Sequence, residues 1–509
     1  MTGRRRVVVT GSGVVSPLGD TPAALHRALA AGTSGRKPIE LFATAGIGCH
    51  EAGEVRPFDP QSYVGDRNLR PLDRTSRLLV VAAQLALADS GWGGREARAG
   101  AGPQAAPAAR PAVPATPAAP ATLAVPAVPA NPAVPAVPAA TATLAASATP
   151  AVPAASAVPA ADIGLVLGTT FCSVRTIAEF DRRGLRLGPT HASPLDFANS
   201  VINAAAGQAA IWHGLRGVNS TLAAGEASGL QAIAQAVELV RTGRADAVLA
   251  GGAEELCFES FFGYHRAGRL CGSRRPDGAA AAGPNAGAVG RAGVGSGGGA
   301  ALAALAAIDE RPVPFDARRN GFSLAEGAAL LMLEEAAAAA ARGAAVRAEV
   351  LGWGAAFAAA GGEAALAGAL ARAVELALAD AATAPREIGC LSASASGSLE
   401  VDRAEALGVA AALGERAAAL PVTAIKAMLG EGLGVSGAWQ AVDLIETIRD
   451  GELPGIAGLE RLAPGLPLGG ASVATRRLAP AERRRALITA VGADGHCAAM
   501  VLGAPPEAP

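Results

Sequence analysis

Short apolar runs that alternate with helix-like segments constrain this chain more than any other feature of its sequence. Runs such as ADAVLAGG (245–252) fit strands that are buried on both faces. Alternating strands and helices favour an α/β fold built in layers. In the C-terminal part we expect strands at 348–357, 388–393, 486–491 and 498–503, helices at 363–379, 402–413 and 433–450, and a turn at 423–431.

The N-terminal part carries similar signals. VVVT (7–10) predicts a short buried strand followed by a glycine-rich turn. The stretch from Thr21 to Gly32 begins with a capping residue and ends with a glycine, as a helix does. We further expect a helix at 74–91, a strand at 162–171, and a turn, a strand and a long helix within 312–343.

Two segments interrupt this pattern. Residues 98–161 are almost entirely Ala, Pro, Val and Thr, and frequent proline removes helices and central strands. With so few large apolar residues this segment cannot bury a core, so we expect a disordered or polyproline-like insertion. It could serve as a tether or a docking element, but neutral low-complexity expansion is the favoured account. Residues 273–308, rich in Gly and Ala, predict a second surface insertion.

Composition excludes several classes of protein. The formal net charge is −1, which offers no basic field for nucleic acid. Six cysteines lie far apart with no CxxC pair, so neither a disulfide framework nor a zinc site is expected. Glycines and a proline interrupt the apolar N-terminal run too early for a signal peptide, and no long apolar span follows. We expect a soluble, cytoplasmic protein with reduced thiols and no cofactor or metal.

The stretch 214–233, GLRGVNSTLAAGEASGLQAI, predicts a strand, a tight turn of small residues and a helix. Such a turn can present a nucleophile at a helix N-terminus, where backbone N–H groups and the helix dipole stabilise negative charge. Here the tip of the turn carries Glu226.

Seven sequence blocks occur in order along the chain: RRVVVTGSGVVSPLG, GLRGVNSTLAAGEASG, RADAVLAGGAEE, PFDARRNGFSLAEGAALLMLEE, CLSASASGSLEVDRAEA, TAIKAMLGEGLGVSGAWQAV and ALITAVGADGHCAAMVLG. Together they resemble the β-ketoacyl-acyl carrier protein synthase family of the thiolase fold. The resemblance implies five α-β-α-β-α layers, made of two similar halves, and usually a dimer. We assign residues 1–97 with 162–272 to the N-terminal half and 309–509 to the C-terminal half.

The resemblance also implies a reaction, a decarboxylative Claisen condensation. In the family a cysteine takes the acyl chain, and two histidines assist the loss of CO₂ and stabilise the enolate. The cysteine position falls on Glu226, the first histidine on Ser394 and the second on Glu431. None of these residues can form the family's thioester or replace a histidine. We therefore expect the condensing activity to be absent.

Other family positions are retained. Lys426, one of only two lysines, matches the family's pocket lysine. Framework acidic residues are expected at Glu326, Asp402 and Glu405, in the role of fold-stabilising ion pairs more than of catalysts. We predict that Glu431 pairs with Lys426 and that Glu226 accepts backbone N–H bonds where an oxyanion would sit.

The block that resembles the family's gate loop differs from the pattern. Ala493 stands where the family has a gate phenylalanine, and Asp494 and His496 follow it. His496 could reach the pocket, although a satisfied loop histidine is the more common case. Cys390 is expected to be a buried strand cysteine.

In lacking the nucleophile, this chain resembles one branch of the family, the chain-length factors. In that branch a glutamine commonly replaces the cysteine. The resemblance then implies a non-condensing subunit that pairs with an active ketosynthase and shapes the tunnel for a chain borne by an acyl carrier protein. An enzyme that decarboxylates or transfers acyl or malonyl thioesters is the alternative. A degenerate, structural paralogue is the third possibility.

Overall fold

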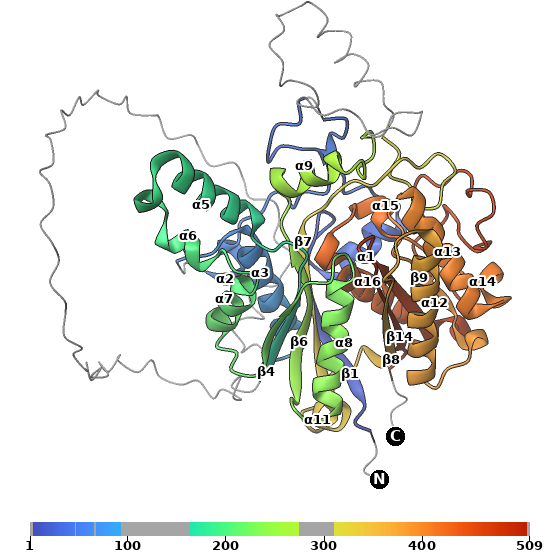
Figure 1. The fold of residues 1–509 in the computed structure, drawn as a ribbon. Helices are drawn as coiled ribbons and strands as arrows, with labels where there is room; N and C mark the ends of the chain where they lie inside the picture. Colours follow the sequence, from blue (N-terminus) through green and yellow to red (C-terminus); the bar gives the residue numbers. More distant parts are fainter. Residues whose placement is uncertain (1–3, 46, 66–67, 93–162, 274–309, 506–509) are drawn as a thin grey trace, which may run out of the picture. The chain divides into compact units, whose positions relative to one another are not determined.

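The structure, a computed structural model, describes residues 4–45, 47–65, 68–92, 163–273 and 310–505. The two expected insertions, 98–161 and 273–308, lie outside the described residues apart from Ser273. Figure 1 shows a central sheet with helices against it.

Ten strands form one sheet in the order β10-β9-β13-β14-β8-β1-β7-β6-β4-β5. In the N-terminal half these are β1 (Val7–Val15), β4 (Ile163–Gly168), β5 (Asn219–Leu222), β6 (Ala247–Glu254) and β7 (Gly327–Glu335). In the C-terminal half they are β8 (Ala348–Phe357), β9 (Cys390–Ser392), β10 (Val422–Thr423), β13 (Arg485–Val491) and β14 (His496–Gly503). A short antiparallel pairing of β1 with β8, at Val8 and Glu349, joins the halves.

The two halves of the sheet have the same topology. In each half the third strand in chain order lies at the edge, followed by the second, fourth, fifth and first. The first two pairings from the edge are parallel and the next two are antiparallel in both halves. β7 pairs with β1 and β6, so the topological boundary lies between β7 and β8 and differs from the expected start of the second half at residue 309.

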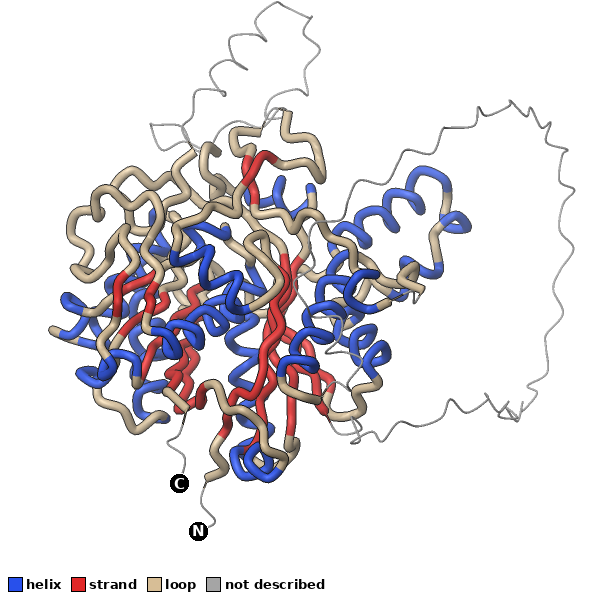
Figure 2. The backbone as a smooth tube through the Cα atoms, turned by 180° about the vertical axis from the view of Figure 1, so that it is seen from behind, coloured by secondary structure: helices blue, strands red, loops and turns tan. Residues whose placement is uncertain are grey.

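Helices complete the five layers of the thiolase-like fold. The helices α8 (Ser228–Arg241) and α16 (Ser436–Asp450) pack on each other and on strands of both halves. The outer helices α3 (Arg74–Asp89) and α7 (Ala204–His213) cover one half, and α12 (Glu363–Asp380) and α13 (Leu399–Leu413) cover the other. Figure 2 shows the strands with helices on both sides.

Sequence explains why the middle layer can form. Residues 436–448 of α16 are all buried, as a helix packed between the two halves of the sheet requires. The helix α8 approaches the segment before α16 so closely that a Cβ on Gly229 would lie 2.4 Å from the Gly434 carbonyl oxygen. Only glycine permits this approach.

No helix within the described chain is both long and apolar enough to cross a membrane.

Shorter elements complete the described chain. The remaining strands are β2 (Lys37–Pro38), β3 (Glu51–Ala52), β11 (Glu452–Leu453) and β12 (Arg476–Arg477), and the remaining α-helices are α1 (Pro22–Ala30), α2 (Gln61–Val64), α5 (Val174–Leu187), α6 (Pro194–Ala198), α9 (Phe258–Arg266), α11 (Ala336–Ala341), α14 (Arg416–Ala419) and α15 (Lys426–Leu429).

Two local expectations were wrong. The long helix within 312–343 is only α11, because the preceding apolar run forms β7, which is buried between β1 and β6. The glycine-rich turn after residue 10 is instead a continuation of β1 to Val15. A Cβ on Gly13 would lie 2.0 Å from the carbonyl oxygen of Ala82 in α3, so the glycine serves close helix packing within a strand.

Candidate functional site

The turn before α8 has the predicted form. It follows β5 and carries Glu226 two residues before the helix begins at Ser228. Gly225 has φ of 53°, in the left-handed region, and a Cβ there would lie 2.3 Å from Oδ2 of Asp494. The glycine is therefore required both by the turn and by the gate loop that packs on it. Glu226 itself is only 6% exposed.

The electrostatic surroundings of Glu226 are mixed. Burial and the nearby Glu431 carboxylate raise the pKa of Glu226, and Asp494 raises it slightly further. Arg269 and the backbone N–H of Glu226 itself lower this pKa by smaller amounts. Nη2 of Arg269 lies 3.9 Å from Oε1 of Glu226. Within the described chain no other residue's backbone N–H donates to this carboxylate. The prediction that several backbone N–H groups bind Glu226 is therefore wrong, and only its own N–H remains.

The positions that match the two family histidines belong to one buried network. Nζ of Lys426 donates to Oε2 of Glu431 at 2.7 Å and to Oγ of Ser394 at 3.1 Å. This confirms the predicted pair of Lys426 and Glu431. The other carboxylate oxygen of Glu431 accepts from the backbone N–H of Leu433 and the hydroxyl of Ser436, and Ser394 also accepts from the N–H of Val491. Every polar atom at these positions is thereby engaged in the fold.

The framework acids are held in different ways. Glu326 forms a bidentate ion pair with Arg74, with bonds of 2.6 and 2.5 Å. Asp402 accepts three backbone N–H bonds and lies 3.6 Å from Arg319. Both therefore form ion pairs within the fold.

Glu405 differs, because no ion pair holds it within the described chain. Its Oε1 accepts from the backbone N–H of Ser394 and the hydroxyl of Thr489, and its Oε2 has no hydrogen-bond partner. Burial raises the pKa of Glu405 to about 7, against these bonds and the attraction of Lys426. The expectation of an ion pair is wrong for Glu405, since Lys426 is engaged by Glu431 and Ser394.

Sequence reasoning missed Glu254. This buried residue ends β6 and accepts backbone N–H bonds from four residues, Thr170, Phe171, Cys172 and Gly434. Burial nevertheless raises the pKa of Glu254 to about 7. An acidic residue at the end of a fully buried strand was the available signal, but its donors come from distant segments.

Arg269 was also missed. Its guanidinium lies over the rings of Phe322 and Tyr264, at 5.7 and 6.0 Å from their centroids, and faces Glu226. A cavity of about 210 Å³ adjoins it and reaches Ala493. This cavity therefore lies between the arginine and the loop that carries Ala493.

The gate loop keeps His496 away from this network. Nδ1 of His496 lies 3.1 Å from Oδ2 of Asp494, and its ring packs edge-on against Phe357 at 4.9 Å. His496 is thus a satisfied loop histidine at the start of β14. Cys390 is a fully buried strand cysteine, as predicted, and Cys497 is buried as well. Among the described residues, no histidine or cysteine bonds to Glu226, Ser394 or Glu431.

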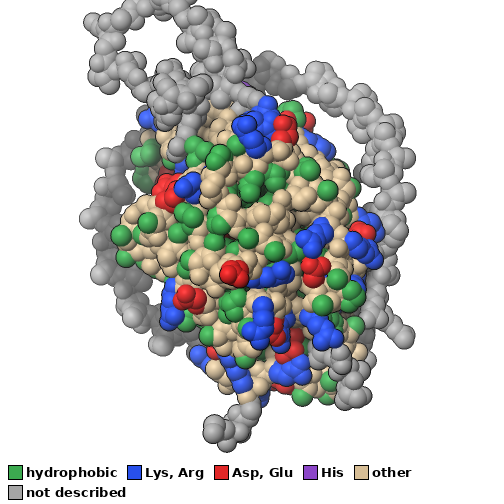
Figure 3. Space-filling view, turned by 90° about the vertical axis from the view of Figure 1, so that its right-hand side faces the viewer, with side chains coloured by type: hydrophobic (Ala, Val, Ile, Leu, Met, Phe, Trp, Pro, Cys, Tyr) green, Lys and Arg blue, Asp and Glu red, His purple; other side chains and the backbone are tan. Residues whose placement is uncertain are grey.

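A larger cavity, of about 690 Å³, lies elsewhere in the C-terminal half, and no predicted site residue lines it. Arg386, Arg416 and Arg485 line this cavity together with Glu387 and Glu482. Figure 3 views the molecule from the side of α14 and shows basic and acidic side chains interspersed over the surface. This cavity is therefore separate from Glu226 and from the Ser394–Lys426–Glu431 network.

Comparisons with known proteins agree with this architecture. The chain is 30% identical over 512 residues to "Putative polyketide beta-ketoacyl synthase 2" of Streptomyces coelicolor, covering 99% of this chain and 97% of that one. It is 28% identical over 472 residues to "3-oxoacyl-[acyl-carrier-protein] synthase 2" of Vibrio cholerae, covering 91% of each. The solved structure described as "The ishigamide ketosynthase/chain length factor" superposes with a TM-score of 0.74 at 25% identity, covering 99% of this chain and 100% of that one.

Two family profiles match the chain directly. "Beta-ketoacyl synthase, N-terminal domain" matches residues 4–106 and 140–311, and "Beta-ketoacyl synthase, C-terminal domain" matches residues 347–460. Together these matches extend over most of the sequence and both halves of the sheet. The chain belongs to the β-ketoacyl synthase family, with the thiolase fold.

Proposed function

We propose that this chain is a non-condensing subunit of fatty acid or polyketide biosynthesis, similar to a chain-length factor. It would pair with an active 3-oxoacyl-acyl carrier protein synthase, and the partner would supply the cysteine and both histidines. Its own contribution would be the shape of the tunnel that receives the growing chain on an acyl carrier protein.

The buried Ser394–Lys426–Glu431 network carries this proposal. Condensation needs donors at the two histidine positions that can stabilise an enolate oxygen. Ser394 and Glu431 stand at those positions and are tied to Lys426 at 3.1 and 2.7 Å. A carboxylate at Glu431 would repel the developing negative charge, so this site is unsuited to the family reaction.

An exposed apolar surface supports a partner. β5 is the last strand of the sheet, so its outer edge has no strand partner within the described chain. The helix α7 packs against β5. An open sheet edge beside exposed apolar side chains is typical of a protein interface. We call the following exposed side chains of α5, α6, α7 and their connections the apolar surface: Leu185, Leu187, Leu195, Phe197, Val201, Ile202 and Ile211.

Co-expression tests the proposal. The chain would be produced with a ketosynthase that retains the cysteine and both histidines and is encoded beside it. We expect a stable heterodimer whose product length changes when this subunit is altered. Purification of the two chains apart, with unchanged products in their mixture, would contradict the proposal.

Two substitutions locate the interface. Ile211→Asp places a charge on the apolar surface, where Ile211 is 79% exposed, and should abolish the heterodimer without unfolding the chain. Val473→Asp is the matched control, since Val473 is also exposed, at 55%, but lies outside that surface. Size-exclusion chromatography with light scattering distinguishes them, and equal behaviour of both variants would place the partner elsewhere.

One observation favours an enzymatic alternative, a reaction on malonyl or acyl thioesters. Arg269 faces Glu226, and burial and the nearby Glu431 raise the pKa of the Glu226 carboxyl. The arginine could hold a substrate carboxylate, and a protonated Glu226 beside it could donate a proton to the substrate. Consumption of malonyl-carrier protein by the isolated chain, lost in both Glu226→Ala and Arg269→Ala, would support this function over the first.

A further inference from the structure

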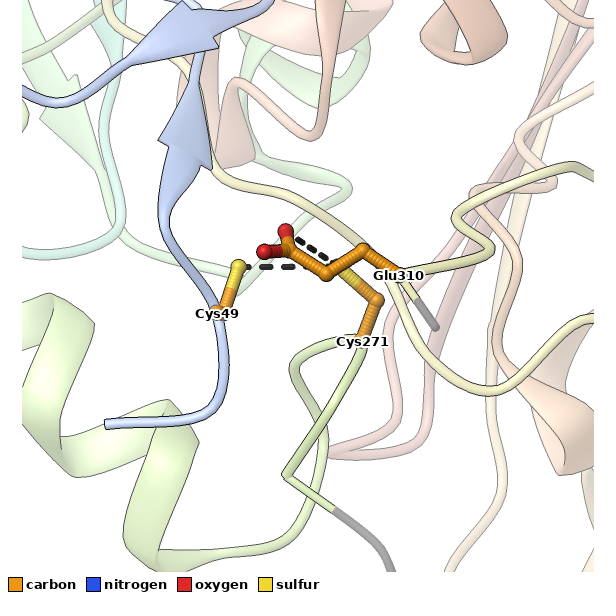
Figure 4. A group of neighbouring side chains, drawn as sticks. All are labelled: Cys49, Cys271 and Glu310. Carbon is orange, nitrogen blue, oxygen red and sulfur yellow. Dashed lines mark hydrogen bonds between the residues drawn. The ribbon is translucent and has the colours of Figure 1, made fainter. Parts of the chain in front are cut away.

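Three side chains from distant parts of the sequence converge beside β3 (Figure 4). Cys49 and Cys271 are fully buried, and Glu310 is partly buried. The two Sγ atoms lie 3.5 Å apart, and Sγ of Cys271 lies 3.6 Å from Oε2 of Glu310. One ligand atom from each residue lies within 4.8 Å of both others.

These separations match the edges of a tetrahedral metal site. With Zn–S bonds of about 2.3 Å and Zn–O bonds of about 2.0–2.2 Å, a tetrahedron separates two sulfurs by roughly 3.8 Å and a sulfur from an oxygen by roughly 3.5 Å. We propose that Cys49, Cys271 and Glu310 bind one zinc ion, with water at the fourth position. This proposal is independent of the proposed function, because it concerns a different cluster.

The local backbone is built for this convergence. Residues Gly48 and Gly272 cross so closely that a Cβ on Gly48 would lie 2.1 Å from the Gly272 carbonyl oxygen. The backbone N–H of His50 donates to Oε1 of Glu310 at 2.9 Å and leaves Oε2 directed at the sulfurs. The crossing and this bond therefore hold two ligands in position before any ion arrives.

Zinc would change the charge state of the cluster. Within the described residues Glu310 forms no ion pair, and Sγ of Cys271 donates to its Oε2 at 3.6 Å. A bound zinc ion would displace both thiol protons into solvent and compensate the thiolates and the carboxylate.

The ion would stabilise a loop that matters for the predicted site. Cys271 stands two residues after Arg269, and its N–H donates to the Phe322 carbonyl at 2.9 Å. The cluster thus links the arginine that faces Glu226 to the segments of Cys49 and Glu310. We expect zinc to raise the thermal stability of the chain and to reduce motion of this loop.

Metal titration of the reduced, metal-free full chain tests the site. We expect one Zn²⁺ per chain, with proton release, in competition with a chromophoric zinc indicator. Co²⁺ should give a tetrahedral visible spectrum with near-ultraviolet thiolate charge-transfer bands. Absence of stoichiometric binding, or a spectrum without thiolate bands, would overturn the proposal.

Variants assign the ligands. Cys49→Ser and Cys271→Ser should each weaken binding by more than roughly 100-fold, since outer-shell partners alone account for about 10–100-fold, and each should reduce the charge-transfer bands. Glu310→Gln should weaken binding while both thiolate bands remain. Cys257→Ser is the matched control, because Cys257 is also buried but bonds to Ser260 instead.

A disulfide is the competing outcome for the two cysteines. The sulfurs stand at 3.5 Å, whereas a disulfide bond is about 2.05 Å. Intact-mass analysis after isolation without reductant would show a loss of two hydrogens if this bond forms. A disulfide that persists under mild reduction and prevents zinc uptake would replace the metal site by a covalent crosslink.

Discussion

Removal of Lys426 tests the central network most directly. Lys426 and Glu431 form an ion pair at 2.7 Å, and their side chains are only 2% and 4% exposed. Lys426→Met keeps the apolar stem but leaves the Glu431 carboxylate buried without its cation. Removal of one partner of such a pair costs about 3–5 kcal/mol, or roughly a hundredfold to several thousandfold in the unfolding equilibrium.

The chain supplies its own control for this substitution. Lys37, the only other lysine, is exposed in β2, so Lys37→Met should change stability by less than about 0.5 kcal/mol. Urea unfolding of each variant, at one protein concentration and in the same oligomeric state, measures the difference.

A double substitution separates the pair from a general loss of packing. Glu431→Gln retains an acceptor for the N–H of Leu433 and the hydroxyl of Ser436. The double variant Lys426→Met, Glu431→Gln buries no unpaired charge and should lose much less than the sum of the single losses. Additive losses, or a Lys426→Met variant as stable as Lys37→Met, would refute this account of the network.

Three further predictions concern the fold. Gly229→Ala should lower the free energy of unfolding, measured by thermal denaturation, by about 1–3 kcal/mol, because the new Cβ would meet the Gly434 carbonyl oxygen. Gly207→Ala on α7 is the control: its Cβ meets nothing within 4 Å, so the substitution should be neutral or stabilising. Burial raises the pKa of Glu405 from 4.5 to about 7, so the folded state keeps a proton that the unfolded state loses. This contribution to the free energy of unfolding is full below pH 4.5 and is lost as the pH rises to about 7. Glu405→Gln should flatten the pH dependence of the free energy of unfolding, measured by urea titrations at several pH values. An unchanged pH dependence in this variant would contradict the prediction. Deletion of residues 98–161 should leave folding intact, and an insoluble product would contradict the interpretation of this segment as an insertion.

Local patterns determined much of what could be predicted. The strand at 348–357 and the helix at 74–91 carry their own periodicity and end signals, and both are confirmed as β8 and, nearly to its bounds, α3. The pair of Lys426 and Glu431 was predictable because the two residues are five positions apart across one short turn. The family blocks likewise placed Glu226 at the turn before α8. In each case the decisive residues are neighbours in the sequence.

Tertiary structure decided what depends on pairing between distant segments. The apolar run of β7 by itself is also compatible with a helix, and it forms a strand because β1 and β6 pair with its two edges. The four donors to Glu254 and the guanidinium beside Glu226 come from segments whose positions follow from strand order. Cys49 and Cys271 are 222 positions apart, so no spacing rule for a metal site could reveal them. The sequence determines the chemical groups that are present, whereas the packing of the two halves determines which of them meet.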